Sequence, residues 1–237
     1  MCAFLCVTIR APAADWTATL GAERTRGDFG IGAQTTIDYV PFSLQARRHP
    51  WSLKVSASHL DLTTDTAPSS GARTQTSAAG AGDTLITARY ALDTAPRWAT
   101  WVDLAVQVKV PTADERDRLG TGETDTTLKL DLYVRRGAWT PFFTLGYKAV
   151  GDVPGLLLQD QWLVTLGIQR GWRPAITTGL LVDYREPSSA GASEALEAVP
   201  YLNWRISRSY GLMVYGIAGL ADGSPDEGLG LQNSFHW

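Results

Sequence analysis

Residues 228–237 of this chain, GLGLQNSFHW, carry the pattern that decides the fold. Large apolar side chains alternate there with glycine or polar ones. One face of an extended strand would therefore be apolar, and its members are Leu229, Leu231, Phe235 and Trp237. A period of two predicts a β-strand, and aromatic rings on its apolar face are typical of a strand that faces lipid at a membrane interface.

The same alternation recurs along the chain, most clearly at 101–110, WVDLAVQVKV. One face of that segment carries only leucine and valine, while the other includes aspartate, glutamine and lysine. Segment 127–135 repeats the pattern, and a helical period appears nowhere. Tilted transmembrane strands have about ten residues. Twelve such strands are predicted, at 16–26, 33–46, 51–62, 83–92, 101–110, 127–135, 141–150, 162–170, 175–185, 196–206, 212–221 and 228–237.

An even number of antiparallel strands predicts an all-β fold, a closed antiparallel transmembrane β-barrel of about 12 strands. Closure pairs every strand edge, as hydrocarbon requires. The chain of 237 residues has a formal charge of −3, which argues against the basic surface of a nucleic-acid-binding protein. Its mean hydropathy of −0.09 is compatible with a barrel, because half of each strand faces a polar lumen.

Residues 1–14, MCAFLCVTIRAPAA, are predicted to be the end of a signal peptide. An apolar run is followed by small residues, which favours cleavage after Ala14, and the missing basic region indicates a start codon further upstream. A disordered N-terminus is the alternative. Both cysteines lie in this segment, so a mature chain would have no disulfide or thiolate site. The barrel is expected to span 15–237 as one domain.

Short and long connections are predicted to alternate along the chain, as in single-chain outer-membrane barrels. The short ones include RRHP before Trp51, RGA before Trp139 and GWRP at 171–174. The long ones are expected at 63–82, 111–125, 153–159 and 187–195. Both termini are therefore expected on the periplasmic side, with the long loops outside the cell.

The tryptophans are predicted to form interfacial girdles, because an indole ring has an apolar body and a polar N–H. Only Trp101 is expected to point inward. At the periplasmic rim the outward set is Trp16, Trp51, Trp98, Trp139, Trp172, Trp204 and Trp237, with Trp162 at the opposite rim.

Charged and polar residues of both signs occupy the opposite parity, which would face the lumen. They are Arg89, Asp103, Gln107, Lys109, Lys129, Asp131, Tyr133, Arg135, Lys148, Asp183, Arg185, Glu197, Tyr201, Asn203 and Arg205. One interpretation is a polar solute path whose charges select the solute. The other is that the charges pair across strands and fill a narrow barrel.

Catalysis by a barrel hydrolase would need a nucleophile and a base within hydrogen-bond reach. His49 and His236 are expected near the periplasmic rim, and His59 near the outer end of its strand. Ser58 has the opposite parity to His59 and would point away. The acidic loop 111–125 lacks the spacing of an EF-hand and is interpreted as solvated or folded over the pore mouth. No catalytic residue, metal or cofactor is predicted.

Family motifs occur in three stretches: KVPTADERDRLGTGETDTTLKLDLYV at 109–134, FFTLGYKAVGD at 142–152 and GLADGSPDEGLGLQNSFHW at 219–237. They resemble the bacterial outer-membrane "transporter" or phenol-degradation MetA-pathway family. Ala221 replaces the small hydroxyl residue usual there, and the final His–Trp pair stands where Arg–Phe is commoner. The resemblance implies an outer-membrane barrel of Gram-negative bacteria and names no substrate.

Together these observations predict a channel for passive uptake of small organic molecules, with aromatic or hydrophobic ones as the expected class; the aromatic part comes only from the family resemblance. Expected partners are outer-membrane lipid, the barrel assembly machinery through Phe235 and Trp237, and a small organic solute, with no nucleic acid. The alternative is a structural or adhesion barrel with a closed, charge-filled lumen that displays its loops.

Overall fold

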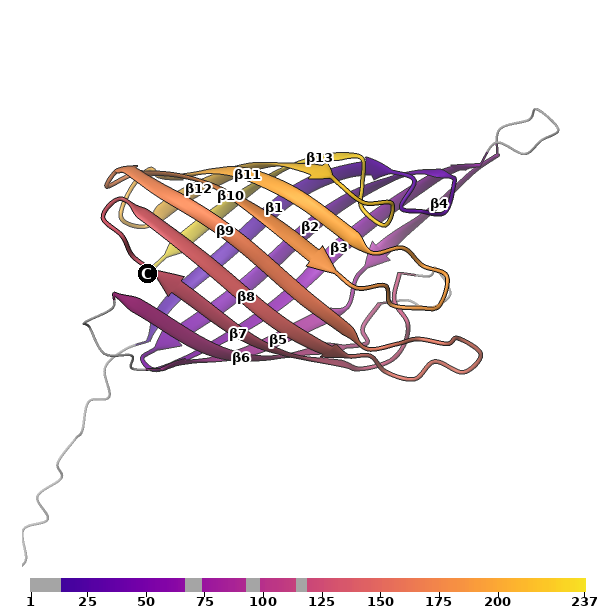
Figure 1. Cartoon of the computed structure of the whole chain (residues 1–237), viewed down its shortest axis with the longest axis horizontal. Helices are drawn as coiled ribbons and strands as arrows, with labels where there is room; N and C mark the ends of the chain where they lie inside the picture. Colours follow the sequence, from indigo (N-terminus) through magenta and orange to yellow (C-terminus); the bar gives the residue numbers. More distant parts are fainter. Residues whose placement is uncertain (1–13, 67–73, 93–98, 114–118) are drawn as a thin grey trace, which may run out of the picture.

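The computed structural model describes residues 14–66, 74–92, 99–113 and 119–237, and every regular element in this part of the chain is a β-strand. The strands wrap around one axis into a barrel, with the C-terminus at one end (Figure 1). That end, where short connections such as His49–Pro50 also lie, is called the turn end here, and the opposite end the loop end. No helix among the described residues has the length and apolarity to span a membrane. The predicted signal peptide spans residues 1–14, and residues 1–13 of it are outside the described part of the chain.

The bounds of the twelve predicted strands differ from the prediction by at most four residues, and β4, Thr74–Ala81, lies in a stretch predicted as a loop. Their bounds are β1 Asp15–Gly27, β2 Gln34–Arg48, β3 Trp51–Thr66, β4 Thr74–Ala81, β5 Thr84–Leu92, β6 Thr100–Val110, β7 Asp125–Val134, β8 Trp139–Ala149, β9 Gln161–Arg173, β10 Ile176–Arg185, β11 Ala195–Arg205, β12 Tyr210–Gly219 and β13 Glu227–His236.

The wall closes on itself because the first strand pairs with the last. β1 is antiparallel to β13 from Thr17 opposite His236 to Arg26 opposite Glu227, and its other edge pairs with β2. β2 in turn pairs with β3, β3 pairs with both β4 and β5, and from β5 onward each strand pairs with the next one in the chain. The barrel is therefore a closed antiparallel meander, as the alternation predicted.

β4 and β5 together form one interrupted strand, so the wall has twelve strands. Both pair with β3, from His59 opposite Ala81 and from Ser56 opposite Leu85. Two residues of β3 thus face three residues of the partner, which is a β-bulge. The Gly82 N–H still donates to the Ser58 carbonyl (2.9 Å). The prediction of a loop at 63–82 is therefore wrong in part. The end of β3 and the whole of β4 form a hairpin that projects beyond the loop end (Figure 1).

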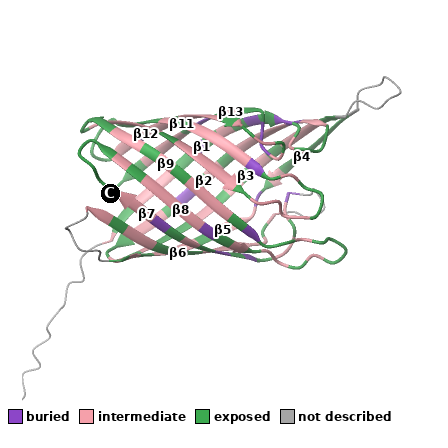
Figure 2. Ribbon diagram, in the orientation of Figure 1, coloured by how far each residue is buried: buried purple, intermediate pink, exposed green. Residues whose placement is uncertain are grey.

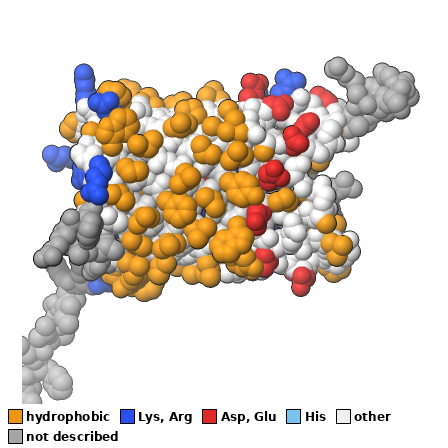
Figure 3. Space-filling model, viewed as in Figure 1, with side chains coloured by type: hydrophobic (Ala, Val, Ile, Leu, Met, Phe, Trp, Pro, Cys, Tyr) orange, Lys and Arg blue, Asp and Glu red, His pale blue; other side chains and the backbone are white. Residues whose placement is uncertain are grey.

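The two faces of the wall differ as the alternation predicted. Large apolar side chains such as Leu104, Leu128 and Leu166 are exposed on the outside, where they form a broad belt (Figure 3). Few residues are fully buried (Figure 2), and the most buried polar ones include Asp125 and Asp131. A protein that places leucine outside and aspartate inside has the inverse of the usual soluble pattern.

Charge is distributed unequally between the two ends. In Figure 3 the Lys and Arg side chains gather at the turn end, and the Asp and Glu side chains gather where the apolar belt meets the loop end. The loop-end connections supply many of these acids, including Asp160, Glu186 and Asp222. Asp160 accepts hydrogen bonds from the Tyr147 hydroxyl and the Val150 N–H, and both lower the pKa of its carboxyl group.

Three aromatic rings lie flat on the inner wall against a glycine of the neighbouring strand. The cross-strand pairs are Phe142 with Gly167, Tyr201 with Gly179 and Tyr215 with Gly230. A Cβ on any of the three glycines would overlap the facing ring. Glycine is therefore required at these strand positions by close approach, although it weakens strands elsewhere.

Replacing Gly230 with alanine should destabilise the barrel by about 1–3 kcal/mol, because the Tyr215 ring must move and give up its hydrogen bond to Glu23. The free energy of unfolding, from urea titrations of the protein in vesicles, measures this. Gly216→Ala is the matched control, because its new Cβ would meet no atom closer than 3.9 Å. Equal stabilities of the two variants would contradict the proposed role of Gly230.

Candidate solute path

The residues predicted to face the lumen fall on the inward parity of their strands. In β5, β6 and β7 this face carries Arg89, Asp103, Lys129 and Asp131, while the valines and leucines beside them point outward. Strand pairing in register fixes this arrangement, because a shift of one residue would turn every charge toward the apolar belt. The inner face of these strands is thus largely polar, whereas β10 to β12 also place Leu181, Val199 and Ile217 on the inner face.

Four neighbouring strands contribute to an ion-pair group inside the barrel, which we call the waist cluster: Arg89, Asp103, Asp131 and Thr144. Arg89 Nη1 pairs with Asp131 and lies 3.3 Å from Asp103 Oδ2, and Thr144 Oγ1 donates to Asp131 Oδ1 (2.6 Å). Asp131 is only 3% exposed. A carboxylate this buried needs its partners, because an unpaired buried charge is very costly.

A second group lies at the loop end around Asp125, which is 3% exposed. Lys109 Nζ and Lys148 Nζ both lie 3.0 Å from Asp125 Oδ2, and the Gly151 N–H donates to the other oxygen (3.1 Å). Lys109 also approaches Asp83 at 3.5 Å. Asp83, in the bulge between β4 and β5, accepts hydrogen bonds from two backbone N–H groups just after β6. The charges therefore tie the loop 111–113 to the wall.

A third group lies on β9, β10 and β11. Arg185 pairs with Glu197 and lies 3.5 Å from Asp183, which accepts a hydrogen bond from Thr165. The Tyr215 hydroxyl donates to Glu23 Oε2 (2.6 Å). Both interpretations of the lumen charges thus have support, since many pair across strands and yet leave space between the groups.

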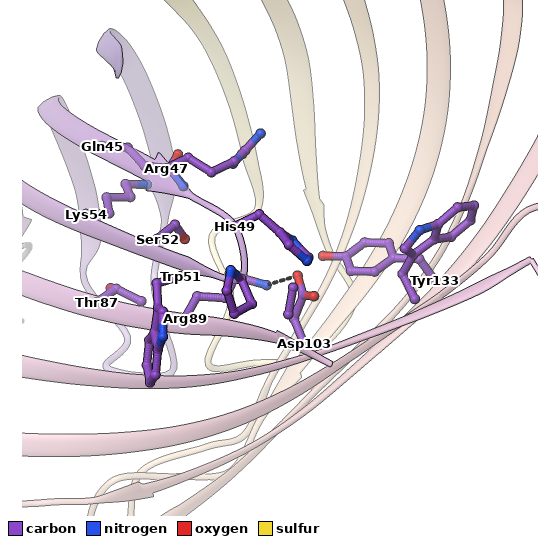
Figure 4. Close-up of a pocket in the computed structure, with 13 residues that line it drawn as sticks. Gln45, Arg47, His49, Trp51, Ser52, Lys54, Thr87, Arg89, Asp103 and Tyr133 are labelled. Carbon is purple, nitrogen blue, oxygen red and sulfur yellow. Dashed lines mark hydrogen bonds and ion pairs between the residues drawn. The ribbon is translucent and has the colours of Figure 1, made fainter. Parts of the chain in front are cut away.

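One cavity opens at the turn end, with a volume of about 560 Å³ (Figure 4). Its walls come from the turn between β2 and β3 and from the turn-end parts of β2, β3, β5, β6 and β7. His49 and Tyr133 project toward one another across it in Figure 4, and Arg89 lies beside Asp103, while Lys54 and Thr87 line it further from the turn end. Its charged lining comprises Arg47, Lys54, Arg89 and Asp103, so cations outnumber carboxylates there.

Two further cavities, of about 510 and 430 Å³, lie at the loop end and share Phe29, Arg185 and Gly223. Phe29 comes from the connection between β1 and β2 and has a positive φ of 51°, which is unusual for a bulky residue. Its ring therefore adds an aromatic surface to an otherwise mixed lining. Neither cavity shares a lining residue with the turn-end cavity. The waist cluster lies between them.

Of the predicted lumen residues, nine line these three cavities: Arg89, Asp103, Gln107, Lys109, Tyr133, Lys148, Asp183, Arg185 and Glu197. Arg135 lines a separate hollow at the turn-end mouth beside Trp101. Lys129, Asp131, Tyr201, Asn203 and Arg205 lie on inner positions of β7 and β11 and line none of the four.

Sequence reasoning missed Phe29, Glu23 and Lys54. The inward parity of β1 and β3 would have found Glu23 and Lys54. Nothing in the sequence pattern marks Phe29, because a loop residue has no strand period.

The tryptophans of the predicted girdles lie near strand ends, apart from Trp98, which is outside the described residues. Seven of them have exposed side chains, between 38% and 65%, on the outward parity: Trp16, Trp51, Trp139, Trp162, Trp172, Trp204 and Trp237. Trp101 faces inward and lines the turn-end cavity.

The histidines lie apart from one another. His59 is exposed on the outer face, and Ser58 lies on the inner one, as parity predicted. His236 forms a hydrogen bond with Thr17 at the turn end (3.0 Å). Among the described residues, no group of three His, Cys, Asp or Glu side chains is arranged to hold a metal ion.

Comparison with solved structures supports the architecture. The chain is similar to an outer-membrane channel from Pseudomonas putida F1 (TM-score 0.77, 14% identity, 96% of this chain and 97% of that one). It is also similar to the KdgM porin (TM-score 0.58, 7% identity, 92% and 99%) and to the translocator domain of the autotransporter NalP from Neisseria meningitidis (0.54, 9%, 97% and 90%). No protein-family model and no curated protein sequence matches the chain. At these identities the likeness shows the fold, a closed outer-membrane-type β-barrel.

Proposed function

We propose that this protein is an outer-membrane channel through which small organic molecules enter passively. The observation that carries the proposal is the contrast between the two faces of the barrel wall. The outer face is an apolar belt, and the inner face carries charged side chains and encloses cavities at both ends. Lipid suits the first surface and a hydrated solute the second. The P. putida protein and KdgM are described as a channel and a porin, which supports the same function here.

The turn end is proposed to face the periplasm and the loop end the exterior. Outer-membrane barrels have short periplasmic turns and long external loops. Here β2 and β3 are joined by two residues, as are β9 and β10, whereas the loop-end connection between β8 and β9 has eleven residues, 150–160. Under this orientation Phe235 and Trp237, exposed beside β1, lie at the periplasmic rim. There they would be available to the barrel assembly machinery.

The proposed solutes are small and carry an apolar or aromatic group. Aromatic side chains lie beside charged ones in both chambers: Trp101 and Tyr133 at the turn end, and Phe29 at the loop end. Such a lining can contact a ring on one side and a polar substituent on the other. The motif resemblance to the MetA-pathway family supports the same class. No catalytic step is proposed, and the waist cluster would set the size limit.

A closed scaffold that displays its loops is the second candidate, and the packing of the waist favours it. Asp131 and the neighbouring Ala105 are both only 3% exposed, so this part of the wall is tightly filled. Such a barrel would present the β3–β4 hairpin and the loop after β6 to external partners.

Single-channel recording separates the two functions. The folded protein in a planar bilayer should produce discrete ohmic current steps if the lumen conducts. Val214→Ala, a change on the outer face, should leave the step size unchanged. A silent bilayer that demonstrably contains folded protein would overturn the channel and favour the scaffold.

A further inference from the structure

Arg170 occupies an unusual position on the outer wall, in β9 near the turn end. It lies directly across from Trp139 of β8 on one side and from Thr178 of β10 on the other. Its guanidinium carbon is 5.1 Å from the centroid of the Trp139 ring and 3.9 Å from that of the Trp172 ring. Trp172 Nε1 donates to Thr178 Oγ1 (2.8 Å), which fixes the second ring. We call these four residues the Arg170 clamp.

The two rings stabilise the cation but cannot accept its N–H groups in the plane of the guanidinium. Arg170 forms no hydrogen bond or ion pair with the described residues, and its buried Nε has no acceptor. By contrast Arg24, an outward arginine of β1 near the loop end, bonds Asp38 through Nε and Nη2, at 2.6 Å each. The barrel therefore pairs Arg24 with a carboxylate of its own and leaves the N–H donors of Arg170 without an acceptor.

No carboxylate of the same region can fill them. The stretches 132–143, 166–182 and 198–221, which form the turn-end halves of β7 to β12, contain no Asp or Glu. They contain six arginines: Arg135, Arg136, Arg170, Arg173, Arg205 and Arg208. The gathering of cations at this end is visible in Figure 3. The described residues therefore leave the Arg170 donors open to an anion from outside the chain.

We infer that the Arg170 clamp binds the phosphate of a glycerophospholipid in the leaflet at the turn end. This inference rests on the membrane placement proposed above. Interfacial tryptophans lie at the level of the lipid headgroups, so a guanidinium between two of them lies at the level of the phosphates. A planar guanidinium can donate two parallel hydrogen bonds to phosphate oxygens. The apolar belt beyond the clamp would receive the acyl chains.

Native mass spectrometry of the folded protein in dodecyl maltoside, titrated with phosphatidylglycerol, tests the inference. The wild type should retain one phospholipid more tightly than Arg170→Gln, whose affinity for that lipid should fall about tenfold, the loss of one charge-assisted contact. Arg170→Lys should lie between them, because it keeps the charge and loses the planar fork. Arg24→Gln is the matched control and should bind like the wild type. It also removes an outward arginine, but that arginine is already paired with Asp38.

Two competitors distinguish the sources of binding. Diacylglycerol with the same acyl chains should not occupy the site, and inorganic phosphate at the same concentration should not displace the lipid. Heat-sensitive gel mobility shows whether Arg170→Gln is folded. If the folded variant bound the lipid as tightly as the wild type, the inference would be overturned. Tight diacylglycerol binding would reduce the site to apolar contact, and displacement by phosphate would make it a free-anion site; either result overturns it. A silent bilayer with arginine-dependent lipid binding would refute only the channel function.

Discussion

Leu104→Arg should destabilise the barrel by about 2–4 kcal/mol when the protein is folded into lipid vesicles. Leu104 lies near the middle of β6, is 46% exposed and pairs with Leu130 on the apolar belt. A guanidinium at that depth would have to leave water for hydrocarbon. Urea-dependent tryptophan fluorescence of vesicle-bound protein measures the change in unfolding free energy.

The size of this effect discriminates between solvents. In a water-soluble barrel an exposed leucine can become arginine with a change of about 0.5 kcal/mol or less. Gln107→Arg, on the inner face of the same strand, is the matched control and should change stability by less than about 1 kcal/mol. If both substitutions were equally harmless, the outer belt would not be facing lipid and the membrane proposal would fail.

Removing the waist arginine should have the next largest effect. Arg89→Ala should cost about 3 kcal/mol, because it leaves the buried Asp131 carboxylate without its cation. The double variant Arg89→Ala/Asp131→Ala should be more stable than Arg89→Ala alone, since no charge is then left uncompensated. The same urea titration measures both variants.

A surface ion pair supplies the comparison. Arg24→Ala breaks the pair with Asp38 on the outer face, where the arginine side chain is 70% exposed, and should destabilise the barrel much less than Arg89→Ala. In planar bilayers the double waist variant should conduct more than the wild type, because two side chains that narrow the lumen are gone. Unchanged conductance would show that the current does not pass the waist cluster.

Strands with two pure faces could be predicted closely from sequence. The segment 101–110 differs from β6 by one residue, because its valines and aspartate leave no doubt about either face. The region 63–82 could not be predicted. It is rich in Ser, Thr, Ala and Gly, and β4 pairs only with β3, so no apolar face was needed to hold it there.

Parity predicts which face a side chain occupies but not which charges meet. Strands in a barrel are tilted, so neighbours at one height come from residues whose offset depends on the register of each pair. Arg89 thus reaches Asp131 two strands away, although Ala105 is its direct partner on β6. Phe29 reaches the loop-end cavities through a backbone conformation that strand alternation does not encode.

The pairing of β1 with β13 has a kinetic consequence. Residues more than two hundred positions apart, such as Thr17 and His236, must meet before the ring is complete. Contacts of this sequence separation slow folding, because the intervening chain loses its freedom before the last seam can stabilise it. Until β1 and β13 pair, each has an edge of unpaired backbone N–H and C=O groups that another chain can bind. Aggregation should therefore compete with folding until this last pair of strands forms.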